Sequence, residues 1–328
     1  MVVCACLLTT VHAKDWVTYE GKAGPGQGKR IVLLSGDEEY RSEEAMPQLA
    51  KILSQRHGFT CTVLFSVDAN GFIDPNAGGS LTHAEALDTA DAIVMALRFR
   101  HWNADAMQRF EAALNRGVPI IALRTSTHAF NGFPQGNRWE KWNCSNKGGF
   151  GKQVLGEAWV SHWGRHKQEA TRGIVEAAVK AEAVLRGVTD IFGTTDVYEA
   201  APPMDAKILV RGQVLKGMQP TDVPADYKKK NASKVEQGVN DPMMPVVWTR
   251  EYTNETGKVN RILCTTMGAA TDLESEGLRR LVVNGIYWGL GLDVPVKASV
   301  DVVGEFKPNM YGFGGAKKNL KPSDYELP

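Results

Sequence analysis

Ionisable and polar side chains in this 328-residue sequence gather directly after four segments with the apolar pattern of buried strands. Asp37 and Glu38 follow the first segment, and Arg98 and Arg100 follow the second. Arg124, Ser126 and His128 follow the third segment, and Thr266 and Asp272 follow the last. The carboxyl ends of parallel strands meet at one edge of a sheet, where open α/β proteins bind their ligands. Carboxylates and imidazoles move protons, and arginines stabilise negative charge. The set therefore predicts acid/base chemistry on a polyol or a small anion.

Two histidines four positions apart, with a tryptophan between them, form a second candidate group. His162 and His166 would converge on a metal ion if their segment were helical, but Gly164 argues against a helix. The alternative is that Trp163 stacks on a sugar while the two imidazoles act as acid and base. We predict no bound cofactor, and a divalent metal ion at this histidine pair is kept as the alternative.

Several common catalytic devices are missing from the sequence. Gly36 is followed by two acids where a dinucleotide site would need a glycine-rich turn, which argues against a nicotinamide or flavin cofactor. The strand-to-turn segment before Arg124 has the layout of a nucleophile elbow, but an arginine stays protonated and cannot be the nucleophile. There is no Cys-x-x-Cys motif. Cys61 and Cys264 lie in apolar runs typical of a core.

Short β-branched runs alternate with segments of helical period, which predicts an α/β fold. We expect a doubly wound, mainly parallel sheet with helices on both faces. The expected strands lie at residues 30–35, 59–65, 91–97, 118–123, 174–177, 207–213, 246–252 and 261–265. The expected helices lie at residues 42–57, 103–117, 150–159 and 274–289.

Composition and the chain ends set further limits. The chain has 38 basic and 37 acidic residues, a net charge of +1, which argues against nucleic-acid binding. Residues 1–13 resemble a truncated signal peptide, so we expect a secreted or periplasmic bacterial protein, and no other segment has the length of a membrane span. We expect a linker at residues 14–28, a surface insertion at 217–244 and an extended tail at 293–328.

Six segments resemble the ThuA-like (trehalose-utilisation) family, and above all its secreted members in planctomycetes and related bacteria. The resemblance covers residues 29–292, which we expect to form one ThuA-like domain. It rests on residues 31–36 (IVLLSG), 119–124 (PIIALR), 155–157 (LGE) before His162, the pair Asp196 and Tyr198, 245–249 (PVVWT) and 261–268 (RILCTTMG).

The resemblance implies a flavodoxin-like fold of the class I glutamine amidotransferase type, in which the cysteine of the elbow has been lost. Arg124 fits that loss, so an amidotransferase is excluded. The resemblance also implies a part in sugar uptake and breakdown.

The sequence departs from the family pattern at two places. The family usually has Gly-His after its final strand, whereas Gly268 is followed here by Ala269, which shifts any role of that histidine to Thr271 or Asp272. The family's Asp-Glu-x-Tyr motif is shortened to Asp-Val-Tyr at residues 196–198.

The favoured hypothesis is a carbohydrate-processing hydrolase or lyase acting on a sugar, keto-sugar or glycoside. Its expected catalytic residues are His128, His162, His166, Asp37, Glu38 and Asp196. Its expected substrate-binding residues are Arg98, Arg100, Arg124, Ser126, Trp163, Tyr198, Thr266 and Asp272. The alternative is a non-catalytic sugar-binding or scaffold protein. The expected partner is a small carbohydrate, and the sequence leaves open whether the chain forms a homo-oligomer.

Overall fold

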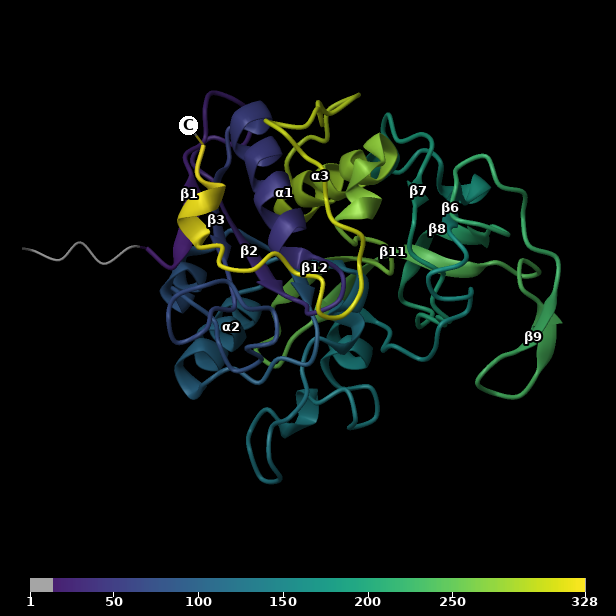
Figure 1. The fold of residues 1–328 in the computed structure, drawn as a ribbon, viewed down its shortest axis with the longest axis horizontal. Coiled ribbons are helices and arrows are strands. Elements are labelled where there is room, and N and C mark those ends of the chain that lie inside the picture. Colours follow the sequence, from purple (N-terminus) through teal and green to yellow (C-terminus); the bar gives the residue numbers. More distant parts are fainter. Residues whose placement is uncertain (1–13, 328) are drawn as a thin grey trace, which may run out of the picture.

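The computed structural model describes residues 14–327, and this part of the chain is built on one ten-stranded sheet (Figure 1). The strand order is β1-β3-β2-β4-β5-β12-β11-β8-β6-β7. These strands are β1 (Trp16–Tyr19), β2 (Arg30–Gly36), β3 (Thr60–Leu64), β4 (Ala92–Leu97), β5 (Ile120–Leu123), β6 (Thr171–Val175), β7 (Phe192–Gly193), β8 (Lys207–Val214), β11 (Met244–Thr253) and β12 (Val259–Thr265). A separate hairpin joins β9 (Lys228–Lys230) to β10 (Glu236–Gly238).

The centre of the sheet is parallel and its two sides are antiparallel. Strands β3, β2, β4, β5 and β12 run in the same direction. Strand β1 lies antiparallel on one side, and β11, β8, β6 and β7 continue the sheet in antiparallel order on the other. The α/β, doubly wound class predicted from the sequence is confirmed, and the four strands whose ends carry predicted site residues, β2, β4, β5 and β12, all belong to the parallel part.

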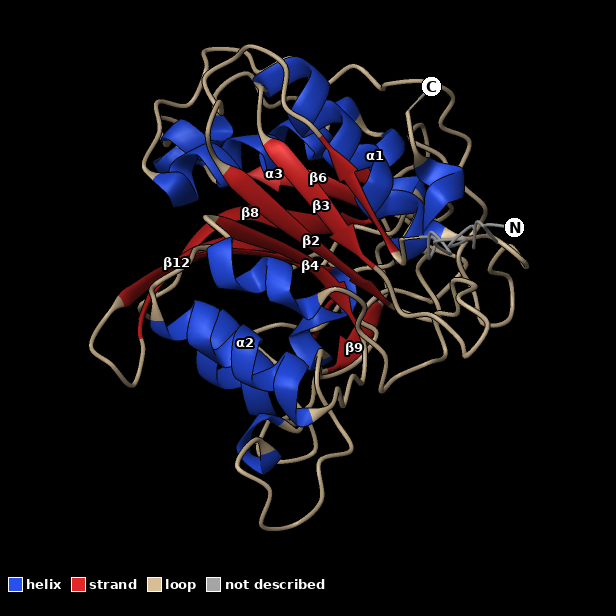
Figure 2. Ribbon diagram, turned by 90° about the vertical axis from the view of Figure 1, so that its left-hand side faces the viewer, coloured by secondary structure: helices blue, strands red, loops and turns tan. Residues whose placement is uncertain are grey.

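Helices cover both faces of the sheet, with α1 (Ser42–His57) and α3 (Glu276–Leu290) on one face and α2 (Ala104–Asn115) on the other (Figure 2). Short helical turns are η1 (Ala84–Thr89), η2 (Arg124–His128), η3 (Glu140–Trp142), η4 (Gly151–Leu155), η5 (Ala177–Val179), η6 (Ala183–Leu185), η7 (Thr271–Glu274) and η8 (Pro322–Tyr325). Within residues 14–327, no helix is both long enough and apolar enough to cross a bilayer.

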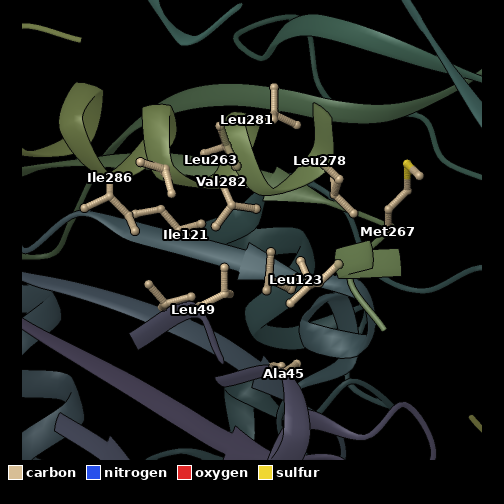
Figure 3. Packing of buried hydrophobic residues seen from close by; sticks show 14 of the residues in the cluster. Ala45, Leu49, Ile121, Leu123, Leu263, Met267, Leu278, Leu281, Val282 and Ile286 are labelled. Carbon is tan, nitrogen blue, oxygen red and sulfur yellow. The ribbon is translucent and has the colours of Figure 1, made fainter. Parts of the chain in front are cut away.

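The core consists of two apolar layers that the sheet separates. Along β2, Ile31 and Leu33 belong to the layer with α1 and α3, whereas Val32 and Leu34 belong to the layer with α2. Successive side chains of a strand point to opposite faces, and a parallel strand covered on both faces is apolar throughout. In the first layer, side chains of α1 and α3, such as Leu49 and Val282, point toward those of β5 and β12 (Figure 3).

The helix ends follow local signals in the sequence. The Asn103 side chain caps α2 by accepting a hydrogen bond from the Ala106 N–H at 3.0 Å. Helix α1 ends at Gly58, whose φ of 79° suits a residue without a Cβ atom. Its start is less usual: Arg41 is left-handed, and the Ser42 hydroxyl, the sequence's natural cap, instead accepts a hydrogen bond from the Asp37 N–H at 3.0 Å.

Three segments differ from the expectation. Residues 14–28, expected as a linker, contain β1, which pairs with β3 in the register Trp16↔Leu64. The helix expected at 150–159 shrinks to the single turn η4, because Gly156 turns the chain with a φ of 100°. The expected insertion contains the β9-β10 hairpin, which projects from one side of the molecule (Figure 1). The expected signal peptide, residues 1–13, lies outside the described residues.

The tail after α3 wraps around the molecule instead of leaving it. It runs past α1 and ends beside β1 (Figure 1). On the way, the Leu320 carbonyl accepts a hydrogen bond from the Ile73 N–H at 2.8 Å. Near its end, the Tyr325 carbonyl accepts one from the Tyr19 hydroxyl at 2.6 Å. The tail thereby joins the end of the described chain to its beginning.

Candidate functional site

Arg124, the first residue after β5, lies at the centre of the strand ends. Its φ of 44° gives the sharp turn expected of an elbow. Its Nη1 donates to the carbonyl oxygens of Asp196 and Thr266, both at 2.7 Å. Its Nη2 donates to Asp196 Oδ1 at 2.9 Å and to the Tyr40 hydroxyl at 3.1 Å. The guanidinium also lies 3.7 Å from the ring centre of Tyr198. Arg124 is fully buried, so it fixes these loops in place and does not reach a ligand.

Asp196 joins Arg124 to both histidines of the predicted pair. Its Oδ2 accepts a hydrogen bond from His162 Nδ1 at 2.8 Å, and its Oδ1 one from His166 Nδ1 at 3.1 Å. Burial by itself would raise the pKa of this carboxyl group, but the charge of Arg124 and the two imidazoles outweigh it, and the pKa lies below the ordinary value. Asp196 is therefore an anion that holds three cationic or polar groups around one point.

The two histidines meet without a helix, their ring centres being 4.5 Å apart. His166 lies between two carboxylates, since its Nε2 is 3.1 Å from Glu39 Oε1. The hydrogen bonds with Asp196 and Glu39 raise the pKa of His166 to about 9. The His162 side chain is 37% exposed, which leaves the edge of its ring that faces away from Asp196 open to solvent.

A small pocket opens beside His162. It has an empty volume of about 260 Å³ and is lined by Glu39, Arg98, Phe99, His128, Trp159, His162 and Tyr198. Trp159 is 40% exposed, and its ring lies 5.8 Å from that of His162 and 5.7 Å from that of His128. The pocket thus combines aromatic rings with groups that donate and accept hydrogen bonds.

His128 is the second imidazole of the pocket and has a different environment. It lies at the end of η2, and its carbonyl accepts a hydrogen bond from the Phe99 N–H at 3.1 Å. Burial, together with the nearby charges of Arg98 and Arg124, lowers the pKa of His128 well below its ordinary value. His128 therefore stays neutral at physiological pH.

The C-terminal tail passes directly beside the pocket. The Gly312 N–H donates to the Glu39 carbonyl at 2.7 Å, and the ring of Tyr311 stacks on that of Tyr40 at 5.1 Å. Phe313 lies 5.1 Å from the guanidinium of Arg98. The tail therefore supports the loop that carries Glu39.

Some predicted site residues form internal ion pairs near the pocket. Glu38 pairs with Arg98 and, at 2.9 Å, with Arg100, whose Nη1 also donates to the Pro75 carbonyl at 3.0 Å. Glu38 and Arg100 do not line the pocket. Of this group only Arg98 reaches the pocket wall.

Four predicted polar residues are buried and hold loops together. Asp37 accepts backbone N–H groups of its own turn and the Thr125 hydroxyl, and Ser126 bonds to the backbone of β4. Asp272 accepts the Thr195 hydroxyl at 2.6 Å and the Gly268 N–H at 2.9 Å. Thr266 has a buried hydroxyl and gives its carbonyl to Arg124. Asp37, Ser126, Thr266 and Asp272 are thus corrected from catalytic or binding residues to structural ones.

Trp163 is also corrected, because its side chain is completely buried. Its indole N–H donates to the Val239 carbonyl at 2.8 Å, so the ring cannot stack on a ligand. Trp159 offers the exposed ring instead. Three further residues line the pocket without having been predicted: Trp159, Phe99 and Glu39. Each stands next to or near a predicted residue. Neighbours in a turn point in different directions, and the sequence gives no signal for which one faces the pocket.

The chain matches no protein-family model and no curated protein sequence. Solved structures that are similar to it include a thua-like protein from Parabacteroides merdae, 14% identical with a TM-score of 0.49, covering 81% of this chain and 92% of that one. A thua-like protein from Bacteroides uniformis is 15% identical with a TM-score of 0.47, covering 82% of this chain and 94% of that one. The α/β class of this chain rests on its own strand order and helix layers.

Proposed function

We propose that the pocket beside Trp159 binds a sugar or keto-sugar and that the chain processes it by acid/base chemistry, as a hydrolase or lyase. Aromatic rings cover the apolar face of a ligand, while a few fixed polar groups orient it. Phe99 and Trp159 supply such rings, and Arg98, His128 and His162 supply the polar groups. The resemblance of the sequence to the ThuA-like family also supports a carbohydrate.

The observation that carries the proposal is the His162–Asp196 pair. A histidine that donates Nδ1–H to a buried carboxylate keeps its Nε2 lone pair for a substrate proton. The 2.8 Å contact with Asp196 sets this tautomer, and the open edge of His162 faces the pocket. His162 would accept a proton from a sugar hydroxyl or from a carbon next to a ketone, and return it to the leaving oxygen.

Arg98 provides the complementary charge. It lines the pocket with its guanidinium between the rings of Phe99 and Phe313, 4.4 and 5.1 Å from their centres. A fixed cation stabilises negative charge as it develops on a carbonyl or leaving-group oxygen. Base and cation therefore lie on the same small cavity, as proton transfer next to a carbonyl requires.

One observation favours the alternative, a non-catalytic sugar-binding protein. Arg124 stands where related folds can carry a nucleophile, and its hydrogen bonds hold the loops around it. Such a protein would keep the aromatic pocket and bind sugar without changing it.

A ligand screen followed by turnover assays separates the two. The chain is screened by thermal shift against disaccharides, their 3-keto derivatives and sugar acids, since a ligand of the folded state raises the melting temperature. For the enzyme, His162→Ala is expected to lower kcat about 10²- to 10⁴-fold while the sugar still binds. His83→Ala, which changes a histidine stacked on Trp16, serves as the matched control and keeps full turnover. Binding without turnover would support the alternative, and no binding of any sugar would contradict both.

A further inference from the structure

Three side chains beside the pocket have the chemistry and spacing of metal ligands. Donor atoms of His162, His166 and Asp196 all lie within 4.8 Å of one another. Among residues 14–327 they form the one such group of histidine, cysteine and carboxylate side chains. We propose that these three residues bind a divalent transition-metal ion, of which Zn²⁺ suits the ligands best.

The ligand types select the class of ion. Two imidazole nitrogens and one carboxylate oxygen suit Zn²⁺ and its transition-metal neighbours, whereas Ca²⁺ and Mg²⁺ prefer sites made of oxygen alone. Three protein ligands with one open position are the usual arrangement of a catalytic zinc site. His162 and Asp196 are far apart in the sequence, so no short motif contains both. The β-bridge between His162 and Tyr198 brings their two segments together.

The donor atoms are close enough for one ion after small side-chain rotations. Each Nδ1 lies near its own oxygen of Asp196, with His162 2.8 Å from Oδ2 and His166 3.1 Å from Oδ1. With zinc bonds of about 2.0–2.1 Å, two ligands at the tetrahedral angle are about 3.3 Å apart. The donor atoms of the three residues lie within 4.8 Å of one another, and rotation of the partly exposed His162 side chain would bring them to this separation.

The surroundings orient the ligands as a metal site requires. His166 Nε2 faces Glu39 Oε1 at 3.1 Å, so the proton of a neutral imidazole belongs on Nε2 and the lone pair on Nδ1. Glu39 is itself buried, and the tail holds its backbone. Arg124 fixes Asp196 Oδ1 at 2.9 Å. Two of the three ligands are thus held in place by a second partner.

The open position of the ion would face the pocket, because His162 is the most exposed of the three ligands and lines it. There a sugar hydroxyl or carbonyl oxygen could bind the ion, and this part rests on the proposed function. With an ion bound, His162 Nδ1 would be a ligand in place of its hydrogen bond with Asp196. The binding of the ion itself depends on neither sugar nor turnover.

The test uses the full chain, stripped with a chelator and dialysed, and needs no substrate. Zn²⁺ is added, the bound metal is measured by elemental analysis, and the melting temperature is recorded with Zn²⁺ and with Ca²⁺. We expect one equivalent of zinc per chain and a higher melting temperature with Zn²⁺ only. His162→Ala is expected to abolish both effects, and Glu39→Gln, which keeps all three ligands, to weaken zinc binding about 10- to 100-fold.

The matched control is His83→Ala, which removes a histidine outside the cluster and should bind zinc like the original chain. Zinc retained by His162→Ala, or less than a tenth of an equivalent on the original chain, would overturn the inference. His162 is partly exposed, and a cooperative melt of the variant without metal shows that it is folded. Sugar turnover by a chain that binds no zinc would leave the proposed function standing and remove only the metal site, whereas zinc binding without any sugar binding would do the reverse.

Discussion

Arg124 and Asp196 form an ion pair that is almost completely shielded from water, with Nη2 and Oδ1 2.9 Å apart and side chains that are 1% and 0% exposed. Both partners have further hydrogen bonds, so neither charge is left alone. This pair connects the turn after β5 with the loop that precedes Tyr198. It gives the site a rigid support on which the exposed groups are arranged.

Removing one member of this pair should be costly. Arg124→Met leaves the carboxylate of Asp196 buried without its main counter-charge, and we expect the free energy of unfolding to fall by about 3–5 kcal/mol. Urea unfolding followed by circular dichroism measures the change. Lys216→Met, which removes an exposed pair with Asp226, is the control and should leave the midpoint unchanged. Equal stability of Arg124→Met and the original chain would show that the pair does not support the fold.

Glu43, in the first turn of α1, should make the fold less stable at high pH. Burial raises the pKa of this carboxyl group to about 8 from an ordinary value of 4.5. Between these values the folded state binds a proton that the unfolded state has lost, so stability falls by about 1.4 kcal/mol per pH unit as the pH rises. Below pH 4.5 both states are protonated and the stability is fully present.

Glu43→Gln removes this titration, so the variant should melt higher than the original chain at pH 8.5, and the difference should shrink toward pH 4.5. Differential scanning calorimetry across this range measures it. Glu276→Gln is the contrasting variant, because the hydrogen bond with Arg280 lowers the pKa of Glu276. It should lose stability at neutral pH. A difference between Glu43→Gln and the original chain that does not vary with pH would contradict the prediction.

The two tryptophans near His162 should respond in opposite ways to truncation. Trp163→Ala empties a buried site and should lower the free energy of unfolding by about 3–5 kcal/mol. Trp159→Ala removes an exposed ring, so stability should change little while sugar affinity falls. Calorimetric titration with the best ligand of the screen, alongside urea unfolding, tests both. A Trp159→Ala variant that binds sugar normally would exclude its ring from the binding surface.

Tyr311 should show how firmly the tail is attached. Its hydroxyl donates to the Thr194 carbonyl at 3.1 Å, and its ring stacks on Tyr40. Tyr311→Phe should cost about 1 kcal/mol through the lost hydrogen bond. Tyr311→Ala should in addition speed proteolysis of the tail, which mass spectrometry detects. Equal cleavage rates for Tyr311→Ala and the original chain would mean that this ring does not hold the tail.

The parallel half of the fold could be predicted because its signals are local. Strand β2 begins at the expected residue and ends one residue later than expected, and helix α1 has the expected boundaries. A continuous apolar run, a 3.6-residue period and the stop at Gly58 are all present in the sequence. Strand β1 was missed because four residues at a sheet edge carry too short a pattern, and their partner β3 is more than forty residues away. The turn η4 depends on one backbone angle at Gly156.

The sequence indicated the strand ends as the place of the candidate site. It indicated less well which side chains line the pocket. Arg124 could be placed at the elbow, but its burial under Asp196 and Tyr198 results from loops distant in the sequence. The same holds for Trp163, whose indole N–H donates to the carbonyl of Val239, which is distant in the sequence. Whether a polar residue faces a ligand or satisfies a neighbouring backbone group is decided by tertiary contacts.

The tail that passes beside the pocket is synthesised after the strands that carry the pocket residues. Glu39 and Arg98 are synthesised well before Gly312 and Phe313, which lie against them. Chains fold from the N-terminus as they are synthesised. A nascent chain can therefore assemble β2, α1 and β4 before the segment that lies against Glu39 and Arg98 has been made.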